Sequence, residues 1–464
     1  MKLFFLLAFI GTLCSSSLLA QELRQYQVTF IDKSGSTYSL EHPSKFLSPR
    51  ACDRRKRQGI RITDKDLPVS ANYVQQLRGA GVRVKQTSRW LNSALVVCEA
   101  TDIPQLRQLA CVEDITYLGK HFIKNNIPTL KKPKRVRHSG VQQATLPDYY
   151  GFVAPQINML HGEFLHERGY KGENMLIAVM DGGFTNMYKM PYFASLHERK
   201  GVVATVDLVD GDSEVSESST HGSKVLSVMA AQAPGQMVGT APAANYVCLK
   251  TEDVRGEYRS EEFYWIVGLE YADSLGVDVV NSSLGYSTFT DASMDYTYKD
   301  MNGKHALASR YSDYAAEVGM IVVNAAGNSG DTEWKYVDTP ADGRYVLSVG
   351  AVDIHNERAT FSSYGPTADG RIKPDVVALG RRIGVASVFT PQVNASNGTS
   401  YAAPLITGLV AALWQAFPHK TNFEIVDAVR QSGSQSEHPD NELGYGLPDF
   451  KKAFELLSSP GRNN

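Results

Sequence analysis

The chain has 464 residues, of which 43% are apolar and 21% are charged, and its formal net charge is −2. This ordinary globular composition excludes wholesale disorder, a collagen-like chain and a membrane channel, and the lack of a global excess of basic residues argues against a nucleic-acid-binding protein. The length corresponds to roughly three domains as a loose prior and suffices to bury a large core without disulfide bonds.

The first twenty residues are typical of a signal peptide. Lys2 gives a short positive start, residues 3–13 form an apolar run too short to span a bilayer, and Ala20 supplies the small residue that a cleavage point requires. Cys14 after the apolar run raises the alternative of a lipoprotein signal, which we disfavour because Leu13 stands where such signals have a small residue. No later segment has eighteen consecutive apolar residues. We therefore expect a soluble protein that is secreted or periplasmic and has no membrane span.

Charge is distributed unevenly between the two ends of the chain. Residues 1–140 carry 23 Lys+Arg and 10 Asp+Glu, a net charge of +13, whereas residues 141–464 carry 24 Lys+Arg and 39 Asp+Glu, a net charge of −15. Two domains could each have acquired their surface charge independently. We favour the alternative that the two parts bind each other, with opposite fields steering their docking.

Residues 21–120 are predicted to form a small mixed α/β unit. Four short apolar segments favour strands, and two segments with helical spacing favour helices. The expected strands span residues 24–32, 82–86, 93–100 and 112–118, and the expected helices span residues 72–81 and 103–110.

Residues 121–150 are interpreted as an exposed basic linker. The segment has little apolar periodicity and combines basic residues with prolines, which is typical of a place where proteases cut. Its basic residues are Lys124, Lys131, Lys132, Lys134, Arg135 and Arg137, and its prolines are Pro128, Pro133 and Pro147.

The chain contains five cysteines, and none of them is predicted to be catalytic. Cys14 belongs to the signal segment, and Cys248 lies in an apolar run, which favours a small core residue over a nucleophile. Cys98 and Cys111 could form a disulfide in an oxidising compartment, a pairing that sequence alone does not decide.

From about residue 151 to residue 464, predicted strands and helices alternate. The strands are short apolar runs, as expected for strands that are buried on both faces. Such alternation predicts an α/β fold, a parallel sheet with helices on both faces, in which functional groups collect beyond the carboxyl ends of the strands. The expected strands span residues 174–181, 245–250, 277–285, 320–328 and 344–352, and the expected helices span residues 222–232, 260–276 and 306–319.

Three polar residues at these positions form a candidate catalytic set. Asp181 ends a predicted strand, His221 precedes an amphipathic helix, and Ser400 stands in a Gly-Thr-Ser turn before a helix of small and apolar residues. Taken singly, the aspartate suits a turn or cap and the histidine suits a cap or a surface position. The serine motif is more specific, since free N–H groups at a helix N-terminus favour negative charge.

Together these residues have the types that acyl transfer requires. A serine hydroxyl is a poor nucleophile at neutral pH, and a histidine can take its proton and later deliver it to the leaving amine. An aspartate fixes the histidine tautomer and stabilises the imidazolium. Asn328, whose Asn-Ser-Gly sequence alone suits an ordinary turn, is the candidate donor to the oxyanion, together with the backbone N–H of Ser400.

In this order of Asp, His and Ser, the sequence resembles a subtilisin-type (subtilase) serine peptidase over about residues 150–455. The aspartate, histidine and serine motifs are DGG, HGSKV and GTSYAAP, and the oxyanion motif is AAGN. They occupy residues 181–183, 221–225, 398–404 and 325–328, with further framework segments at 239–250, 282–285, 361–366 and 372–380.

The resemblance implies a subtilisin-like parallel sheet and a serine endopeptidase that cleaves polypeptides through an acyl-enzyme, with no cofactor required for chemistry. It implies that residues 21–120 are an α+β inhibitory pro-segment, which makes the protein a zymogen and its own intramolecular partner. The segments 48–60 and 89–97 give a looser resemblance to secreted subtilases of the Bacteroidetes. The resemblance also implies that two segments line the primary specificity pocket and pair with an extended substrate: Ser283, Leu284 and Gly285, and Ala325, Ala326 and Gly327.

The sequence departs from the family pattern at three positions. Gly182 replaces the usual Ser or Thr, Ser223 replaces Thr, and Tyr401 replaces Met. Neither Gly182 nor Ser223 supplies a catalytic atom, so we expect activity to be retained, whereas Tyr401 removes an oxidisable thioether and could alter access of the leaving group. The stretch 285–328 is longer than in compact subtilisins, and its acids could bind calcium, although their irregular spacing favours a solvated loop. These acids are Asp291, Asp295 and Asp300.

Two other functions compete with this interpretation. A pseudopeptidase, a binding protein that retains the fold, would normally lack a catalytic or oxyanion residue, and none is missing here. An esterase of the α/β-hydrolase type requires Gly-x-Ser-x-Gly and the order Ser, acid, His. Ser400 does not satisfy that pattern, since Ala402 occupies the second glycine position.

Overall fold

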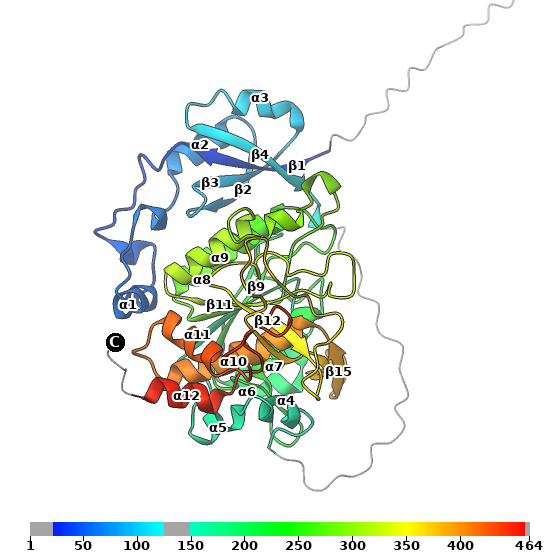
Figure 1. Cartoon of the computed structure of the whole chain (residues 1–464). Helices are drawn as coiled ribbons and strands as arrows, with labels where there is room; N and C mark the ends of the chain where they lie inside the picture. The colour runs from blue at the N-terminus through cyan, green and yellow to red at the C-terminus, as the bar shows by residue number, and fades with distance from the viewer. Residues whose placement is uncertain (1–21, 125–148, 460–464) are drawn as a thin grey trace, which may run out of the picture.

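The computed structural model describes residues 22–124 and 149–459. The predicted signal segment, residues 1–20, and most of the predicted basic linker lie outside the described residues. Two sheets dominate the described chain, a small antiparallel sheet near the N-terminus and a larger parallel sheet that follows it (Figure 1). Among the helices of the described residues, none is both long and apolar enough to cross a membrane.

The small sheet is antiparallel and has the strand order β2-β3-β1-β4. Its central strand β3 is buried at every position, and helix α2 packs beside β2, so that apolar residues of the sheet and the helix share one core. All four predicted strands and the first predicted helix of this region are confirmed. The bounds are Arg24–Phe30 for β1, Arg83–Ser88 for β2, Ser93–Cys98 for β3, Val112–Lys120 for β4 and Ala71–Gly79 for α2.

The structure corrects three expectations for this region. The helix predicted over residues 103–110 is only α3, Ile103–Leu106, after which turns lead Cys111 back into the core. Helix α1, Pro49–Arg57, was not predicted, because it buries arginines rather than an apolar stripe. The disulfide left open between Cys98 and Cys111 is not formed, and both thiols are free and buried.

The large sheet has seven parallel strands in the order β13-β12-β11-β10-β5-β9-β6. All five predicted strands are present, and four of them are buried at every position. Neither β6, which is a half-exposed edge strand, nor the four-residue β13 was predicted. The bounds are Leu176–Asp181 for β5, Val202–Asp207 for β6, Asn245–Lys250 for β9, Val279–Ser282 for β10, Ile321–Ala325 for β11, Leu347–Val352 for β12 and Val376–Leu379 for β13.

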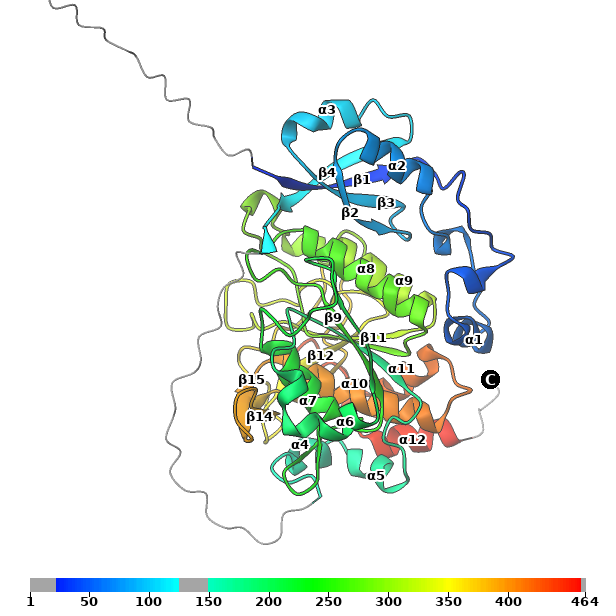
Figure 2. The same ribbon diagram turned by 180° about the vertical axis from the view of Figure 1, so that it is seen from behind.

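Helices cover both faces of this sheet, as predicted (Figures 1 and 2). Successive side chains of a strand point to opposite faces. In β5, Ile177 and Val179 therefore join the core under α7 and α10, while Ala178 and Met180 join the core under α8 and α9. The bounds are His221–Ala230 for α7, Ser260–Leu275 for α8, Leu307–Glu317 for α9 and Thr399–Ala416 for α10.

Shorter elements complete the outer layer. Helices α5, α11 and α12 pack against α10, and the hairpin of β14 and β15 leads directly into the turn before α10. The bounds are Ala154–Asn158 for α4, Gly162–Glu167 for α5, Ala194–Glu198 for α6, Asn422–Gln431 for α11, Phe450–Ser458 for α12, Gln232–Ala233 for β7, Met237–Val238 for β8, Arg381–Ala386 for β14 and Val393–Asn397 for β15.

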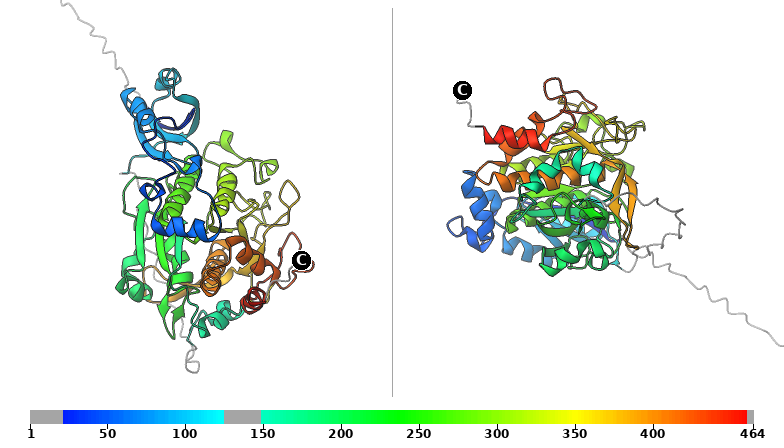
Figure 3. Two further views of the ribbon diagram at one scale, coloured as in Figure 1. Left: turned by 90° about the vertical axis from the view of Figure 1, so that its left-hand side faces the viewer. Right: turned by 90° about the horizontal axis from the view of Figure 1, so that it is seen from below.

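Helix α8 lies between the two sheets, with the large sheet on one side and the small sheet on the other (Figures 1 and 3). Nearly all of its residues are buried, which is the pattern of a helix with neighbours all round rather than of a surface helix. The N-terminal region is thus packed onto the larger body through α8 and its neighbour α9.

Candidate active site

Asp181 and His221 meet at the carboxyl edge of the large sheet. Asp181 is the last residue of β5, and His221 is the first residue of α7. The Asp181 Oδ2 atom lies 2.7 Å from Nδ1 of His221, and its Oδ1 accepts a hydrogen bond of 2.8 Å from the backbone N–H of Gly182. The carboxyl group is almost fully buried, whereas the imidazole is 32% exposed. Nδ1 of His221 therefore faces Asp181, and the opposite edge of the ring, which carries Nε2, faces away from the aspartate.

Opposing effects set the pKa of His221. Burial of the imidazole alone would lower the pKa, but the negative charge of Asp181 and the hydrogen bond to it outweigh that effect. The net result is a His221 pKa above its ordinary value of about 6.5. Asp181 thus strengthens His221 as a proton acceptor and stabilises its charged form.

Two glycines allow α7 to approach the end of β5 this closely. A Cβ atom at Gly222 would lie 2.6 Å from the carbonyl oxygen of Gly183 and 3.0 Å from Cβ of Asp181. A Cβ atom at Gly183, whose φ is +147°, would lie 2.3 Å from the carbonyl oxygen of Glu217. The second glycine of the Gly-Gly motif and the glycine of the His-Gly motif are therefore required by packing at this junction.

Ser400 is the second residue of α10 and is brought to the same edge by β15 and its turn at Gly398. Its backbone carbonyl accepts a hydrogen bond of 2.8 Å from Oγ of Ser283, and the ring of the next residue, Tyr401, lies 5.4 Å from the His221 ring. Among the described residues, no hydrogen bond joins Ser400 Oγ to His221. Such bonds often tighten only when substrate is bound.

Asn328 is held with its amide oxygen turned away from solvent. Its Oδ1 accepts a hydrogen bond of 2.9 Å from the backbone N–H of Thr399 and lies 3.1 Å from the Thr399 hydroxyl. Because Oδ1 faces these donors, the NH₂ group must point the other way, and Asn328 is itself exposed. An amide donor therefore faces open space beside the first turn of α10. Sequence reasoning did not assign Thr399 this positioning role.

The predicted substrate-binding residues lie at the ends of two neighbouring strands. Ser283, Leu284 and Gly285 follow β10, and Ala325, Ala326 and Gly327 end or follow β11. The strands are in parallel register with Ser282 opposite Asn324, and the side-chain amide of Asn324 donates a bond of 2.9 Å to the carbonyl of Leu284. The hydroxyl of Thr399 also lies 3.1 Å from the carbonyl of Gly327. Both segments therefore lie beside the start of α10.

Comparison with known protein families agrees with this arrangement. The profile of the Subtilase family matches residues 172–446, which is more than half of the chain. The chain belongs to the subtilase family. A second profile, the Peptidase S8 propeptide domain of Bacteroidota, matches residues 25–134. The resemblance found in the sequence is thus confirmed, and this subtilase is a serine-type endopeptidase with an N-terminal propeptide domain. Subtilases need no cofactor for catalysis.

Characterised relatives cover most of the chain at moderate identity. Subtilisin NAT of Bacillus subtilis subsp. natto and subtilisin E of Bacillus subtilis are each 30% identical over 325 residues, which is 69% of this chain and 75% of the relative. Alkaline elastase YaB of a Bacillus species is 30% identical over 299 residues, which is 64% of this chain and 69% of the relative.

Solved structures show the same fold. The MycP3 protease from the type VII (ESX-3) secretion system has a TM-score of 0.51 and 23% identity, covering 66% of this chain and 88% of its own. MycP1 from Mycobacterium smegmatis has a TM-score of 0.52 and 20% identity, covering 70% of this chain and 90% of its own. The predicted α/β subtilisin-like class, with a small α+β unit before it, is confirmed.

A buried charge cluster fastens the N-terminal region to α8. Arg54 and Arg55 of α1 and Arg89 after β2 all pair with Asp273 near the end of α8, and Arg55 also pairs with Asp66. The side chains of Arg54, Arg55 and Asp273 are 0 or 1% exposed. Three arginines contributed by one region thus surround one aspartate of the other. The sequence showed the charge imbalance but not this cluster.

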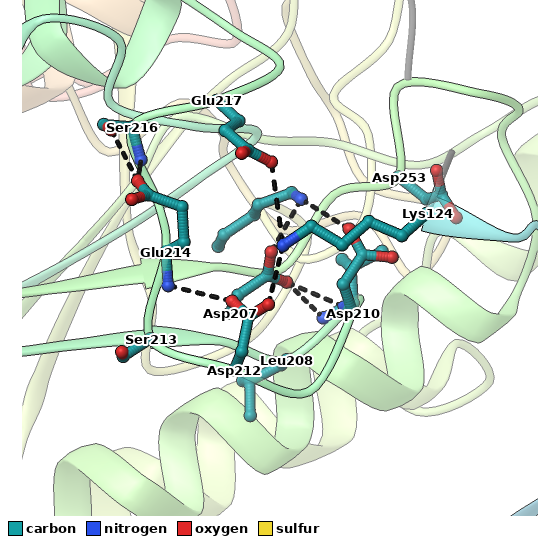
Figure 4. Close-up of polar contacts among 12 residues, drawn as sticks. Lys124, Asp207, Leu208, Asp210, Asp212, Ser213, Glu214, Ser216, Glu217 and Asp253 are labelled. Atoms are coloured by element: carbon teal, nitrogen blue, oxygen red, sulfur yellow. Dashed lines mark hydrogen bonds and ion pairs between the residues drawn. The ribbon is translucent and has the colours of Figure 1, made fainter. Parts of the chain in front are cut away.

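A second charged contact joins Lys124 to two acids that precede His221 in the chain (Figure 4). Nζ of Lys124, a residue near the start of the predicted linker, lies 2.6 Å from Oδ2 of Asp212 and 3.7 Å from Oε2 of Glu217. Glu217 is four residues before His221, and its backbone carbonyl lies against Gly183. The start of the predicted linker therefore lies beside the segment that leads into His221.

The acids of the stretch 285–328, for which the sequence favoured a solvated loop over calcium binding, are used in local turns. Asp291 accepts from the backbone N–H of Ser293, Asp295 from that of Phe289, and Asp300 from that of Thr297. These three carboxylates do not fit a shared cation site. In the described part of the chain, the one group of three acids with ligand atoms within 4.8 Å of one another is Glu252, Glu257 and Glu261.

Proposed function

We propose that this subtilase is an exported zymogen that hydrolyses internal peptide bonds through an acyl-enzyme formed on Ser400. We assign residues 1–20 as the signal peptide, residues 21–120 as the inhibitory pro-segment, residues 121–150 as the linker that is cut, and residues 151–464 as the catalytic domain. The observation that carries the catalytic assignment is the hydrogen-bonded pair of Asp181 and His221 beside the first turn of α10.

In the first step, Ser400 Oγ attacks the carbonyl carbon of the scissile bond while Nε2 of His221 accepts the hydroxyl proton. Negative charge moves to the substrate oxygen, which receives hydrogen bonds from the Asn328 amide and the Ser400 backbone N–H. The imidazolium formed on His221 is stabilised by Asp181. It then donates its proton to the departing amine, and the C–N bond breaks to leave the acyl-enzyme.

In the second step, water replaces the amine. His221 takes a proton from the water as its oxygen attacks the ester carbonyl, and the same donors stabilise the second oxyanion. Collapse of this intermediate returns the proton to Ser400 Oγ and releases the new carboxyl end. The substrate backbone lies as an added strand against the segments that follow β10 and β11.

The pro-segment inhibits by occupying the approach to the site. Its docking is supported by the buried cluster around Asp273. At the start of the linker, Lys124 adds an exposed contact with Glu217. The opposite net charges of the two regions, +13 and −15 at the division after residue 140, favour their association before the linker is cut.

Replacement of the nucleophile tests the assignment. The Ser400→Ala variant is expected to hydrolyse no denatured protein and to bind no fluorophosphonate, while Ser458→Ala, which alters an exposed serine of α12, should behave as the unaltered protein. Activity that persists in a carefully purified Ser400→Ala sample would refute the mechanism. Failure of the unaltered, processed enzyme to react with the probe would support the pseudopeptidase instead.

A further inference from the structure

Asp338 is a buried carboxyl group that stands behind both substrate-binding segments. A Cβ atom at Gly285 would lie 3.0 Å from Cβ of Asp338, and one at Gly327 would lie 2.5 Å from its Oδ2 atom. The backbone N–H of Asp338 donates to the carbonyl of Ala326 at 3.3 Å, and the next residue, Thr339, bridges to Tyr286. The carboxyl group therefore lies where the two segments meet, at positions where only glycine leaves room for it.

This carboxyl group has no adequate partner. Asp338 is 7% exposed, its Oδ1 atom is buried without a hydrogen bond, and no basic side chain of the described residues forms an ion pair with it. The hydroxyl of Ser287 and the indole of Trp334 lie near enough to favour its charged form, but neither completes a hydrogen bond to Oδ1. Buried polar atoms in folded proteins are normally paired, so this exception requires an explanation.

The neighbouring acid Asp342 differs from Asp338 in having hydrogen-bond partners. Asp342 is also buried, but it accepts hydrogen bonds from Ser309 Oγ and from the backbone N–H of Gly303. Its partners account for its burial as part of the fold. Asp338 lacks such partners and faces the substrate-binding segments, which indicates that its missing partner arrives with the ligand.

The charge state of Asp338 suits a cationic ligand. Burial raises the pKa of Asp338 to about 7, with the charge of Asp342 acting in the same direction and Ser287 and Trp334 acting against it. The carboxyl group is therefore near the midpoint of its titration at neutral pH, and an arriving positive charge favours ionisation. An acidic side chain would be repelled, and an apolar one would leave Oδ1 unpaired.

We propose that Asp338 forms the base of the primary specificity pocket and selects substrates with Lys or Arg immediately before the scissile bond. An ammonium or guanidinium group on a long side chain supplies both the charge and the N–H donors that this site lacks. Gly285 and Gly327 bring the backbone of both substrate-binding segments directly against this carboxyl group. This inference rests on the proposed function and adds the class of substrate to it.

The test uses the processed enzyme and a set of chromogenic peptides that differ only in the residue before the cleaved bond: Arg, Lys, Leu or Glu. The enzyme is expected to show a kcat/KM for the Arg and Lys peptides at least about 100-fold higher than for the Leu peptide. Asp338→Asn should lower kcat/KM for the two basic peptides by about 100-fold and so remove their advantage over the Leu peptide. The matched control is Asp331→Asn, which removes an exposed charge from the same loop and should leave the profile unchanged.

The controls separate the two levels of the proposal. Reaction of Asp338→Asn with a fluorophosphonate shows that it folds and that its catalytic residues are intact. A processed enzyme that cleaves the Leu peptide as well as the basic peptides overturns the inference while leaving the peptidase mechanism standing, whatever the variant does. A basic preference that survives in Asp338→Asn overturns it as well. An enzyme that cleaves no peptide and does not react with the probe defeats the mechanism and this inference with it.

Discussion

Both oxygens of the Asp181 carboxyl group are occupied, one by His221 and the other by the backbone of Gly182. The aspartate cannot rotate without breaking one of these bonds, and the imidazole is therefore held in one orientation. Because Nδ1 of His221 must carry the proton to donate to Asp181, Nε2 is left free as an acceptor. The tautomer that proton transfer from Ser400 requires thus follows from a single pair of contacts.

Replacement of the aspartate should disable this arrangement without disturbing the fold. In Asp181→Asn, the amide no longer requires a proton on Nδ1 of His221 and no longer stabilises the imidazolium. We expect kcat at neutral pH to fall by roughly 10⁴-fold, the loss typical of such a change. Active-site titration and steady-state kinetics on one peptide give the value. A loss of less than tenfold would contradict the role assigned to Asp181.

The pH profile should show the same interaction. His221 must be neutral to accept a proton, and Asp181 raises the pKa of His221 above its ordinary value. The Leu peptide suits this measurement because its side chain carries no charge. Its kcat/KM should reach a maximum at alkaline pH and fall on acidification, with a midpoint above pH 6.5. In Asp181→Asn, the midpoint of the residual activity should move to lower pH.

The oxyanion donor can be tested through kcat. Removal of one such donor typically costs 10²–10³-fold in kcat, so Asn328→Ala should lose about that much while KM changes little. Thr399→Val keeps the backbone donor to Asn328 Oδ1 and removes the hydroxyl contact, so its loss should be smaller. Equal losses in the two variants would mean that Thr399 acts by another route.

At the scale of single residues, the sequence predicted those functional residues that belong to recognisable motifs. Asp181, His221 and Ser400 each stand in a recognisable run of neighbours, and the structure brings the first two into contact. Thr399 and Asp338 could not be assigned in that way. Their importance depends on which atoms face them across the fold, and a buried carboxyl group without a partner is visible only in three dimensions.

At the scale of elements, α1 is the feature that binds the two regions most firmly. Arg54 is fully buried and pairs with Asp273, and its Nη1 also donates to the backbone carbonyl of Val277. Nearby, Gln58 donates to the carbonyl of Gly319 and accepts from the backbone of Asn422. The helix lies apart from the small sheet, against the ends of α8 and α11 (Figures 1 and 3). It is a second attachment point beyond the sheet.

Truncation of a buried partner should weaken this attachment strongly. In a full chain that carries Ser400→Ala to prevent processing, Arg54→Ala leaves Asp273 with one partner fewer and should lower the free energy of unfolding by about 3–5 kcal/mol. Arg107→Ala, which removes an exposed pair with Asp114, should change it by less than about 1 kcal/mol. Denaturant titration measures both. Equal effects would show that the cluster contributes no more than a surface pair.

Element prediction succeeded where one periodicity dominated and failed where none did. The buried strands β5, β10, β11 and β12 are apolar runs bounded by turns, and all were predicted. The edge strand β6 is partly exposed on both faces, so its sequence pattern gave no signal. Helix α1 failed for a different reason, since the groups that it buries are charged.

For the whole molecule, the opposed charges of the two regions predict salt-dependent docking. A separate fragment of residues 22–124 should inhibit the processed enzyme, and its inhibition constant should rise with ionic strength because the exposed contact of Lys124 with Asp212 is screened. Lys124→Ala in the fragment should weaken inhibition and reduce the salt dependence. Absence of inhibition at any fragment concentration would reject the pro-segment assignment.

Sequence patterns could not reveal how the two regions are placed against each other. The opposite net charges of the two regions predicted that they associate. The position of the small sheet on α8 and α9 depends instead on complementary surfaces from segments far apart in the chain. Trp90 illustrates the point, since its ring stacks on Tyr311 of α9 at 6.4 Å and meets Tyr314 edge-on at 4.9 Å. No local pattern joins these residues.

Helix α8 is buried on nearly every side, and the segment that forms the small sheet against it comes earlier in the chain. The ribosome releases residues 22–124 well before residues 260–275, so the segment that forms the small sheet is already available when the helix that it covers is made. The N-terminal region can therefore cover the aromatic side chains of α8 as soon as this helix forms, which limits their exposure to other proteins. A gene that encoded the two regions in the opposite order would lose this protection.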